Sequence, residues 1–316
     1  MIVTVTANPC VDKTVAVEEF DLYRMNRVRV LCTDPSGKGI NVSKTLRAVG
    51  ADTLCTGFDF VEDGAGSVLK ADLDHCGIPH DLVQVKGALR VCTKIFDESR
   101  KHTIEVNERG AAVGASDAEA LLEKIEKVAK RCAFLTLSGS LPQGMGKDFY
   151  ARCVKRIGEV APECRVVVDA EGELLLQALA EAPYLIKPNI HELELTFGCK
   201  IEDIKDLDAK AQEILARYGL GVICVSLGHK GAYIATRDEA YCCAPVRVEV
   251  RSLQGAGDAM VAGLCLALEK GLSLCEVLRY GVAMAGAAIA TEGTRPGTKQ
   301  DFERLLLTDI NMQKVR

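Results

Sequence analysis

Short runs of apolar and β-branched residues alternate along this chain with longer stretches in which apolar residues recur at helical spacing. The short runs are typical of buried strands, and the longer stretches predict amphipathic helices that pack against them. This alternation indicates a mostly parallel sheet with crossover helices. The candidate core strands are Ile2–Ala7, Thr53–Gly57, Phe134–Leu137, Val166–Asp169, Tyr184–Lys187, Val222–Leu227 and Ala232–Thr236.

Several helix boundaries are marked by residues that favour helix ends. Ser116 with Glu119, and Ser273 with Glu276, have the spacing of a capping box in front of an apolar helical pattern. Three glycines stand where C-terminal caps are expected: Gly50, Gly219 and Gly271.

Residues 11–35 and 89–110 differ from the rest because they alternate like strands and show no convincing helix. Their expected strands are Val15–Val17, Val28–Leu31, Cys92–Phe96 and Thr103–Val106. We expect them to pair into a small β-lid over a site, although two extra edge hairpins without a gating role would give the same pattern. The remaining segments, 1–10, 36–88 and 111–316, would then form the α/β domain that binds nucleotide and substrate.

The composition narrows the function classes. With 316 residues, 48% hydrophobic and 26% charged, the chain is typical of a globular enzyme, and its net charge of −5 argues against bulk binding of nucleic acid. The N-terminal apolar run is too short for a signal peptide, and no run approaches the roughly 18 residues of a membrane span. The 14 cysteines include no C-x-x-C pair, so we expect reduced thiols and a cytoplasmic protein without a membrane partner.

The most informative segment is Ser252–Gly263, where Gly255, Ala256 and Gly257 precede Asp258 and a run of small and apolar residues. This pattern predicts a tight turn that leads into a helix N-terminus, whose free N–H groups and dipole attract an anion. Asp258 beside such an anion hole has the position of a general base, and the reaction indicated is phosphoryl transfer from a nucleotide to a hydroxyl. A plain helix cap is the alternative.

Two polar turns lie near the N-terminus. Asp12 follows the first strand after Asn8-Pro9, where ligands of open α/β sheets bind, and could hold sugar hydroxyls. The segment Ser36–Ser43 is a second glycine-rich turn, with Gly37 and Lys38 before Asn41, but it lacks the spacing of a P-loop. Ordinary turns are the alternative for both.

Cations and later loops complete the set of candidates. One or two of the lid cations Arg27, Arg90 and Lys94 could clamp a substrate phosphate, with solvated surface residues as the alternative. After Lys187, Asn189 and Glu192 could order waters around Mg²⁺ or contact nucleotide phosphates, unless they only cap a helix. The next strand ends in a turn that could pack on the nucleotide or merely close a hairpin; it contains Ser226, Gly228 and Gly231.

Together these segments resemble the carbohydrate kinase family that includes ribokinase, the PfkB-type kinases, in the branch that acts on phosphorylated hexoses. The matching stretches, in chain order, are Asn8-Pro9 with Asp12, Gly37–Val42, Ser138–Pro142, Lys187–Asn189 with Glu192, Ser226–Gly228 with Gly231, and Gly255–Asp258. The resemblance covers nearly the whole chain. It implies a ribokinase-like three-layer α/β/α fold with a β-lid, and a homodimer formed through that lid.

The resemblance also implies the chemistry. The γ-phosphoryl group of ATP, with Mg²⁺, would pass to a hydroxyl of a ketohexose phosphate, with Asp258 as base and the amides of residues 255–258 as anion hole. The sugar phosphate would contact Asp12, Gly37, Lys38, Asn41, Arg27, Arg90 and Lys94. The nucleotide and its metal would be served by Lys187, Asn189, Glu192, Ser226, Gly228 and Gly231, with Asn189 and Glu192 holding Mg²⁺ through water.

The substrate expected from the resemblance is fructose 1-phosphate, which would give fructose 1,6-bisphosphate. Tagatose 6-phosphate is the alternative within the class, and a regulator that binds sugar phosphate without turnover is the alternative outside it. The chain departs from the family pattern at Ser36, Phe60, Gln254 and Ala259. Ser36 and Phe60 lie near the expected sugar site, so the ketose isomer stays open.

Overall fold

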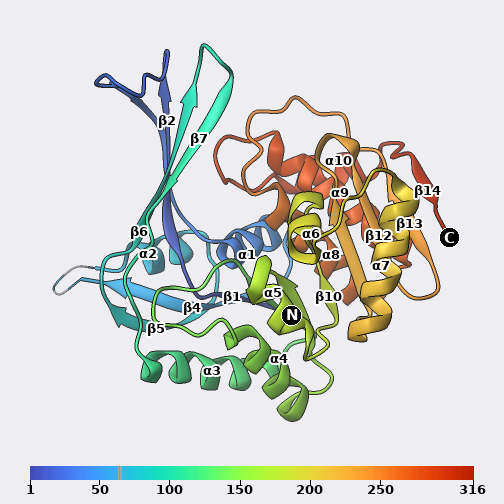
Figure 1. The fold of residues 1–316 in the computed structure, drawn as a ribbon. Coiled ribbons are helices and arrows are strands. Elements are labelled where there is room, and N and C mark those ends of the chain that lie inside the picture. Colours follow the sequence, from blue (N-terminus) through green and yellow to red (C-terminus); the bar gives the residue numbers. More distant parts are fainter. Residues whose placement is uncertain (63, 65) are drawn as a thin grey trace.

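Two β-sheets form the frame of the molecule (Figure 1). The computed structural model of the chain describes residues 1–62, 64 and 66–316. Within these residues the large sheet has ten strands in the order β14-β13-β12-β11-β10-β9-β8-β1-β4-β5. Their bounds are β1 (Ile2–Thr6), β4 (Thr53–Val61), β5 (His80–Lys86), β8 (Phe134–Ser138), β9 (Arg165–Asp169), β10 (Leu185–Ile186), β11 (Val222–Ser226), β12 (Ala232–Ala235), β13 (Ala240–Cys243) and β14 (Met312–Lys314).

The large sheet is parallel from β5 to β11 and antiparallel at its other end. β1 pairs in parallel with β4 on one side and with β8 on the other. From β11 onward each strand runs opposite to its neighbour, so β11–β12, β12–β13 and β13–β14 are antiparallel pairs. The carboxyl ends of the parallel strands therefore meet at one edge, which is where open α/β sheets bind ligands.

The small sheet consists of β2 (Cys10–Val17), β3 (Arg29–Ser36), β6 (Arg90–Asp97) and β7 (His102–Asn107), in the order β3-β2-β6-β7. β2 and β6 run parallel at its centre, and β3 and β7 flank them antiparallel. Figure 1 shows it standing away from the helical body. The strand pairing predicted for the two alternating segments is thus present.

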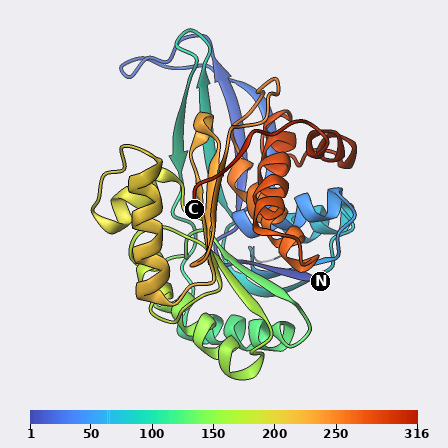
Figure 2. The same cartoon turned by 90° about the vertical axis from the view of Figure 1, so that its right-hand side faces the viewer.

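Helices cover both faces of the large sheet (Figure 2). One layer contains α3 (Ala115–Ala129), α4 (Phe149–Val160), α5 (Gly172–Leu179), α6 (Ile190–Phe197) and α7 (Ile204–Tyr218). The opposite layer contains α1 (Lys38–Ala48), α2 (Val68–His75), α8 (Ala256–Glu269), α9 (Leu274–Ile289) and α10 (Lys299–Leu306). A short 3₁₀ helix spans Gly228–Lys230. None of the described helices is long and apolar enough to cross a membrane.

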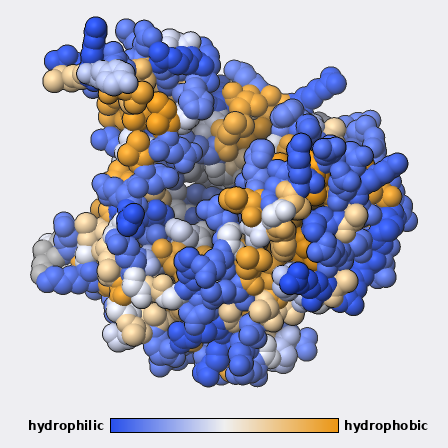
Figure 3. All heavy atoms as spheres, viewed as in Figure 1, coloured by the Kyte–Doolittle hydropathy of each residue, from blue (hydrophilic) through white to orange (hydrophobic). Residues whose placement is uncertain are grey.

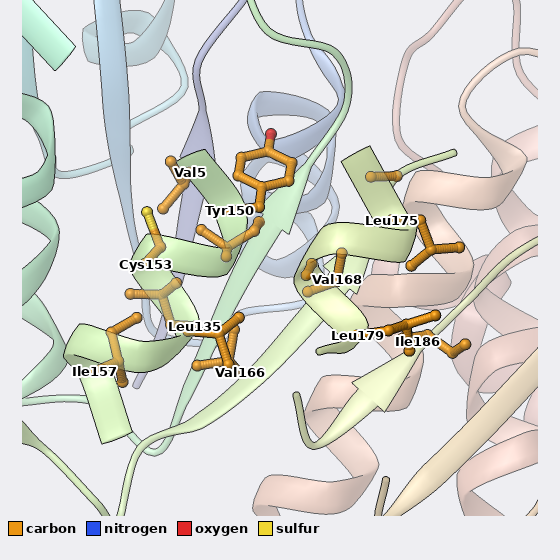
Figure 4. Packing of buried hydrophobic residues seen from close by; sticks show 14 of the residues in the cluster. Val5, Leu135, Tyr150, Cys153, Ile157, Val166, Val168, Leu175, Leu179 and Ile186 are labelled. Atoms are coloured by element: carbon orange, nitrogen blue, oxygen red, sulfur yellow. The ribbon is translucent and has the colours of Figure 1, made fainter. Parts of the chain in front are cut away.

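Successive residues of a strand belong to two separate hydrophobic clusters, one on each face of the large sheet. Val166 and Val168 of β9 pack against α4 and α5, whereas Val167 between them joins the cluster under α8 and α9. This follows from the period of two along a strand. Figure 4 shows Tyr150 and Leu175 from the helices meeting the first of these faces. Each fully buried aliphatic side chain contributes about 1.5–3 kcal/mol to folding.

The predicted fold class is confirmed: helices sandwich a mostly parallel sheet. The predicted strand Ala232–Thr236 exists as β12 but is antiparallel to β11. The sequence interpretation missed β5 at the sheet edge, where only Val85 is buried. It also missed β13 and β14, which extend the antiparallel end.

One predicted helix start is wrong and another is confirmed. Helix α3 begins at Ala115 with Gly114 as N-cap, not at a box headed by Ser116, because Asp117 reaches back and accepts the Gly114 N–H at 2.8 Å. Ser273 and Glu276 do form the predicted capping box at α9. The expected glycine caps are also present, with Gly219 left-handed at the C-cap of α7.

Candidate functional site

A cleft of about 2140 Å³ opens at the carboxyl ends of the parallel strands and extends beneath the small sheet. Figure 3 shows the surface hollowed between the small sheet and the body. The cleft is lined by residues that follow β1, β8, β9 and β10, and by the first turns of α1 and α8. Segments far apart in the sequence therefore meet in one concave site.

Asp258 lies in the first turn of α8 at the floor of the cleft, and only 7% of it is exposed. Gly255 is the N-cap and has φ 73°, a left-handed conformation that glycine adopts without strain. The first intrahelical bond of this turn runs from Ala259 N–H to Gly255 C=O, so the N–H groups of Ala256 and Gly257 precede the helical ladder. Those groups and the helix dipole favour an anion beside Asp258.

Burial raises the pKa of Asp258 to about 6, although Lys38 nearby and a hydrogen bond from Asn41 oppose the shift. Asn41 Nδ2 donates to Asp258 Oδ2 at 2.8 Å, and Ser36 Oγ donates to Asn41 Oδ1 at 3.1 Å. These two hydrogen bonds in series fix the Asp258 carboxylate through one of its oxygens. A carboxylate that titrates near neutrality and lines a cleft is suited to accept a proton from a hydroxyl.

Two lysines flank a buried carboxylate that the sequence interpretation did not select. Asp169, 1% exposed at the end of β9, lies 3.3 Å from Lys187 Nζ and 3.4 Å from Lys38 Nζ. Although burial opposes ionisation, these two cations hold the pKa of Asp169 below its usual value. In turn, Asp169 raises the pKa of Lys38. The only available sequence signal was an acidic residue at the carboxyl end of a core strand.

Lys187 also lies against the first turn of α8. A Cβ built on Gly257 would stand 3.3 Å from Lys187 Nζ, so the ammonium group approaches the backbone at this glycine. The Lys187 ammonium group and the N–H groups at the start of α8 therefore meet at one point of the cleft. Such an arrangement stabilises negative charge that develops on a transferred group.

The glycines before and within α1 allow close packing against β1. A Cβ on Gly37, whose φ is 149°, would lie 2.6 Å from Thr6 Cγ2. A Cβ on Gly39 would lie 2.5 Å from the carbonyl oxygen of Val5. Only glycine fits at these two positions, and the close approach brings Lys38 and Asn41 into the cleft.

The structure joins Asp12 and Lys94, which the sequence placed with the sugar. Lys94 Nζ lies 3.2 Å from Asp12 Oδ1 and donates to Gln254 Oε1 at 3.0 Å. Both residues are buried and line the cleft. Gln254, one of the departures from the family pattern, thus helps to hold the lysine.

The other two predicted cations differ in position. Arg90 lines the cleft, and its guanidinium donates to the carbonyls of Asn8 at 2.9 Å and Pro9 at 3.4 Å. Arg27 lies in the exposed connection between β2 and β3 and is not among the described residues that line the cleft. The structure brings Arg90, but not Arg27, to the site within this chain.

The expected nucleotide residues occupy two settings. Asn189 and Glu192 line the cleft and form the capping box of α6, so the helix-cap alternative is realised, with each donating its backbone N–H to the other's side chain at 2.8 Å. Ser226 also lines the cleft.

Gly228 and Gly231 belong to the hairpin that joins β11 to β12 and are not among the described cleft-lining residues. A Cβ on Gly231 would lie 1.9 Å from the Cys243 carbonyl oxygen, which explains this glycine structurally.

Comparisons with known proteins agree with this geometry. Residues 5–301 match the model of the pfkB family carbohydrate kinases. The 1-phosphofructokinase of Rhodobacter capsulatus is 34% identical over 92% of this chain and 91% of its own, and that of Bacillus subtilis is 32% identical over 100% of both. The crystal structure of phosphofructokinase-2 from Escherichia coli in complex with substrates and products superposes with a TM-score of 0.89, at 27% identity over 96% of this chain and 98% of that one. The chain therefore belongs to the pfkB family of carbohydrate kinases and is a phosphotransferase with an alcohol group as acceptor.

Proposed function

We propose that this kinase transfers the γ-phosphoryl group of ATP to fructose 1-phosphate and forms fructose 1,6-bisphosphate. The observation that carries the proposal is Asp258, buried at the N-terminus of α8 with a pKa raised to about 6. Two relatives with 32–34% identity are named 1-phosphofructokinase, which supports this acceptor.

In this mechanism Asp258 accepts the proton of the acceptor hydroxyl through the oxygen that Asn41 does not hold. Asn41 and Ser36 keep the carboxylate oriented during the transfer. The N–H groups at the start of α8 receive the transferred phosphoryl group as charge develops on it. Lys187, held by Asp169, adds a cation at the same point.

The donor set beside α6 fits a hard cation. Asn189 and Glu192 line the cleft and carry side-chain oxygens, and oxygen ligands and water are what Mg²⁺ prefers. Mg²⁺, when bound with ATP, would neutralise charge on the phosphates. Because Oδ1 of Asn189 and Oε2 of Glu192 serve the capping box, we infer that these residues hold the ion through water.

The sugar phosphate is assigned to the opposite end of the cleft. Asp12, oriented by Lys94, accepts hydrogen bonds from sugar hydroxyls, and Gly37 and Lys38 approach the same ligand with Asn41. Arg90 offers a guanidinium to the 1-phosphate, where a bidentate contact is strong. Arg27 serves this site only if a second copy of the chain supplies it.

The same residues could accept tagatose 6-phosphate, which is the alternative substrate. An ADP-release assay with fructose 1-phosphate, tagatose 6-phosphate, fructose 6-phosphate and free fructose decides between them. The proposal is supported if kcat/KM is highest for fructose 1-phosphate. If kcat/KM is higher for tagatose 6-phosphate, then tagatose 6-phosphate is the substrate instead. Binding of sugar phosphate without ADP release would show a regulator and refute the kinase.

We also propose that the small sheet mediates a homodimer. Large apolar side chains are exposed on this sheet and its β2–β3 connection, and Figure 3 shows hydrophobic surface in this region. They include Leu22, Tyr23, Met25, Val30, Leu31 and Val106. Light scattering should give twice the chain mass, and Val30→Asp with Leu31→Asp should return it to a single chain. A monomeric wild-type protein would refute the dimer.

A further inference from the structure

Three potential metal ligands converge where the small sheet meets the cleft. The sulfur atoms of Cys10 and Cys92 and a carboxylate oxygen of Asp12 all lie within 4.8 Å of one another. All three residues are buried and line the cleft. No other such group of three occurs among the residues that the structure describes.

The strand register explains why these side chains meet. Cys10 and Asp12 are two residues apart on β2, so they point to the same face of the small sheet. Cys92 on β6 is the direct partner of Asp12 in the parallel pairing. β2 and β6 form the centre of the sheet, so the three ligands rest on hydrogen-bonded strands and not on a loop (Figure 1).

We propose that Cys10, Asp12 and Cys92 bind a thiophilic divalent cation of the Zn²⁺ type, and that the bound ion excludes the sugar phosphate. Two thiolates and one carboxylate are ligands of Zn²⁺, and three protein ligands leave a fourth position open toward the cleft. Mg²⁺ avoids sulfur, so the cation of the kinase reaction does not compete for this set. The exclusion of substrate rests on the proposed function, in which Asp12 contacts the sugar.

The charges around the cluster are compatible with the ion. When the metal–sulfur bonds form, the two free thiols each release a proton to solvent, so the three ligands carry three negative charges against two on the cation. Lys94 and Arg90 face the cluster and offset the remaining charge. Lys94 loses Asp12 as a partner but keeps Gln254, whose Oε1 lies 3.0 Å away.

The predicted effect is competition at a single residue. Asp12 cannot coordinate the cation and accept sugar hydroxyls with the same oxygen. Zn²⁺ should therefore raise the KM for the sugar phosphate and leave the KM for ATP nearly unchanged. Excess Mg²⁺ should not relieve the inhibition, whereas a chelator should.

The direct test measures binding without turnover, on the whole chain in reducing buffer without nucleotide. Zn²⁺ binding is followed by calorimetry, and Co²⁺ is used as a second probe because thiolate ligands give it a charge-transfer band. Cys10→Ser, Cys92→Ser and Asp12→Asn should each weaken binding by about 10- to 100-fold or more, since even outer partners of a metal are worth that much. The intensity of the cobalt band per bound ion should fall in both serine variants, because each keeps only one thiolate ligand, and should be retained in Asp12→Asn.

Another close pair of thiols serves as the control. Cys132 and Cys164 have sulfur atoms 3.4 Å apart, but no third ligand joins them in the described residues. Cys132→Ser should retain Zn²⁺ affinity and the cobalt band. Wild-type binding in the Cys10 and Cys92 variants, or equal loss in the Cys132 variant, would overturn the site.

Kinase activity is scored separately, which keeps this proposal apart from the proposed function. Metal binding without activity on any hexose phosphate would refute the function and leave the metal site standing. Activity on fructose 1-phosphate without metal binding would refute the site alone. If Zn²⁺ binds at these residues and fructose 1-phosphate does not compete, the exclusion of substrate is refuted.

Discussion

Replacing Asp258 by asparagine should remove most of the turnover and at the same time stabilise the fold. Asparagine can still accept the 2.8 Å hydrogen bond from Asn41, but its amide then presents N–H groups to the acceptor hydroxyl and cannot take its proton. General-base catalysis is worth about 10²–10⁴-fold, which is about 3–5 kcal/mol of transition-state stabilisation. ATP binding should change little.

The gain in stability follows from the raised pKa. Burial moves the pKa of Asp258 from 3.8 in the unfolded chain to about 6 in the fold. The protonated form is therefore favoured by folding, so this stability is fully present below about pH 4 and is lost as the pH rises through 6. At 1.36 kcal/mol per pKa unit, the difference between the two pKa values lowers the free energy of unfolding at neutral pH by at most about 3 kcal/mol, relative to its value below pH 4. Asparagine carries no charge and avoids this loss.

The assay combines kcat/KM from ADP release with thermal unfolding between pH 4 and pH 8. Wild-type kcat/KM should fall as the pH drops below about 6, and the stability advantage of Asp258→Asn should grow from pH 4 to pH 6 and then level off. Asp169→Asn is the matched control with the opposite sign. The pKa of Asp169 is lowered, so its stability is present above the unfolded pKa and lost in acid. Its substitution should cost about 3–5 kcal/mol at pH 7, because Lys187 stays buried without its partner.

Either of two results would refute the reasoning about Asp258. Turnover within a few-fold of wild type would remove it as the base. A variant that is less stable than wild type at pH 7 would show that the carboxylate contributes to the fold and is not held there at a cost.

Two further substitutions test the phosphate contacts. Gly257→Val should lower kcat by about 10²-fold or more, because its Cβ would stand 3.3 Å from Lys187 Nζ and displace a preorganised cation and N–H donors. The control is Gly158→Ala, which should keep full activity because nothing lies within 4 Å of its Cβ. Equal effects of the two substitutions would contradict the anion hole. Arg90→Ala should raise the KM for the sugar phosphate, at a cost of about 1.5–3 kcal/mol, and lower the selectivity for phosphorylated over free hexose. The exposed Arg27→Ala is its control in a monomeric preparation, and an unchanged selectivity ratio in the Arg90 variant would return that arginine to a structural role.

The parts of the site that could be predicted from sequence are those determined by local backbone chemistry. The turn before Asp258 needs a residue in the left-handed conformation, which Gly255 supplies, and a backbone that Lys187 can approach closely, which Gly257 supplies. The two glycines therefore predict this turn from the sequence. Gly37 and Gly39 predict the turn into α1 in the same way, whereas their close packing against β1 is visible only in the structure. Strands buried on both faces, such as β1, also stand out as runs of β-branched residues.

What could not be predicted depends on distant partners. Asp169 looks like any acidic residue after a strand until Lys38 and Lys187, from two other elements, are placed beside it. β5 was missed because an edge strand with one buried residue carries no clear pattern. Cys10 and Cys92 are 82 positions apart in the sequence, and only the register of β2 and β6 brings them together.

The connections between the small sheet and the α/β body are very short, so the small sheet cannot rotate without moving the segments to which it is joined. Only residues 7–9 separate β1 from β2, and only Gly37 separates β3 from α1. A rotation of the small sheet must therefore pull on the strand end that leads to Asp12 and on the N-cap that positions Lys38. Force applied at the far tip of β2 would therefore be transmitted to the end of the cleft that Asp12 and Lys38 line, and a tether fixed there should shift both side chains.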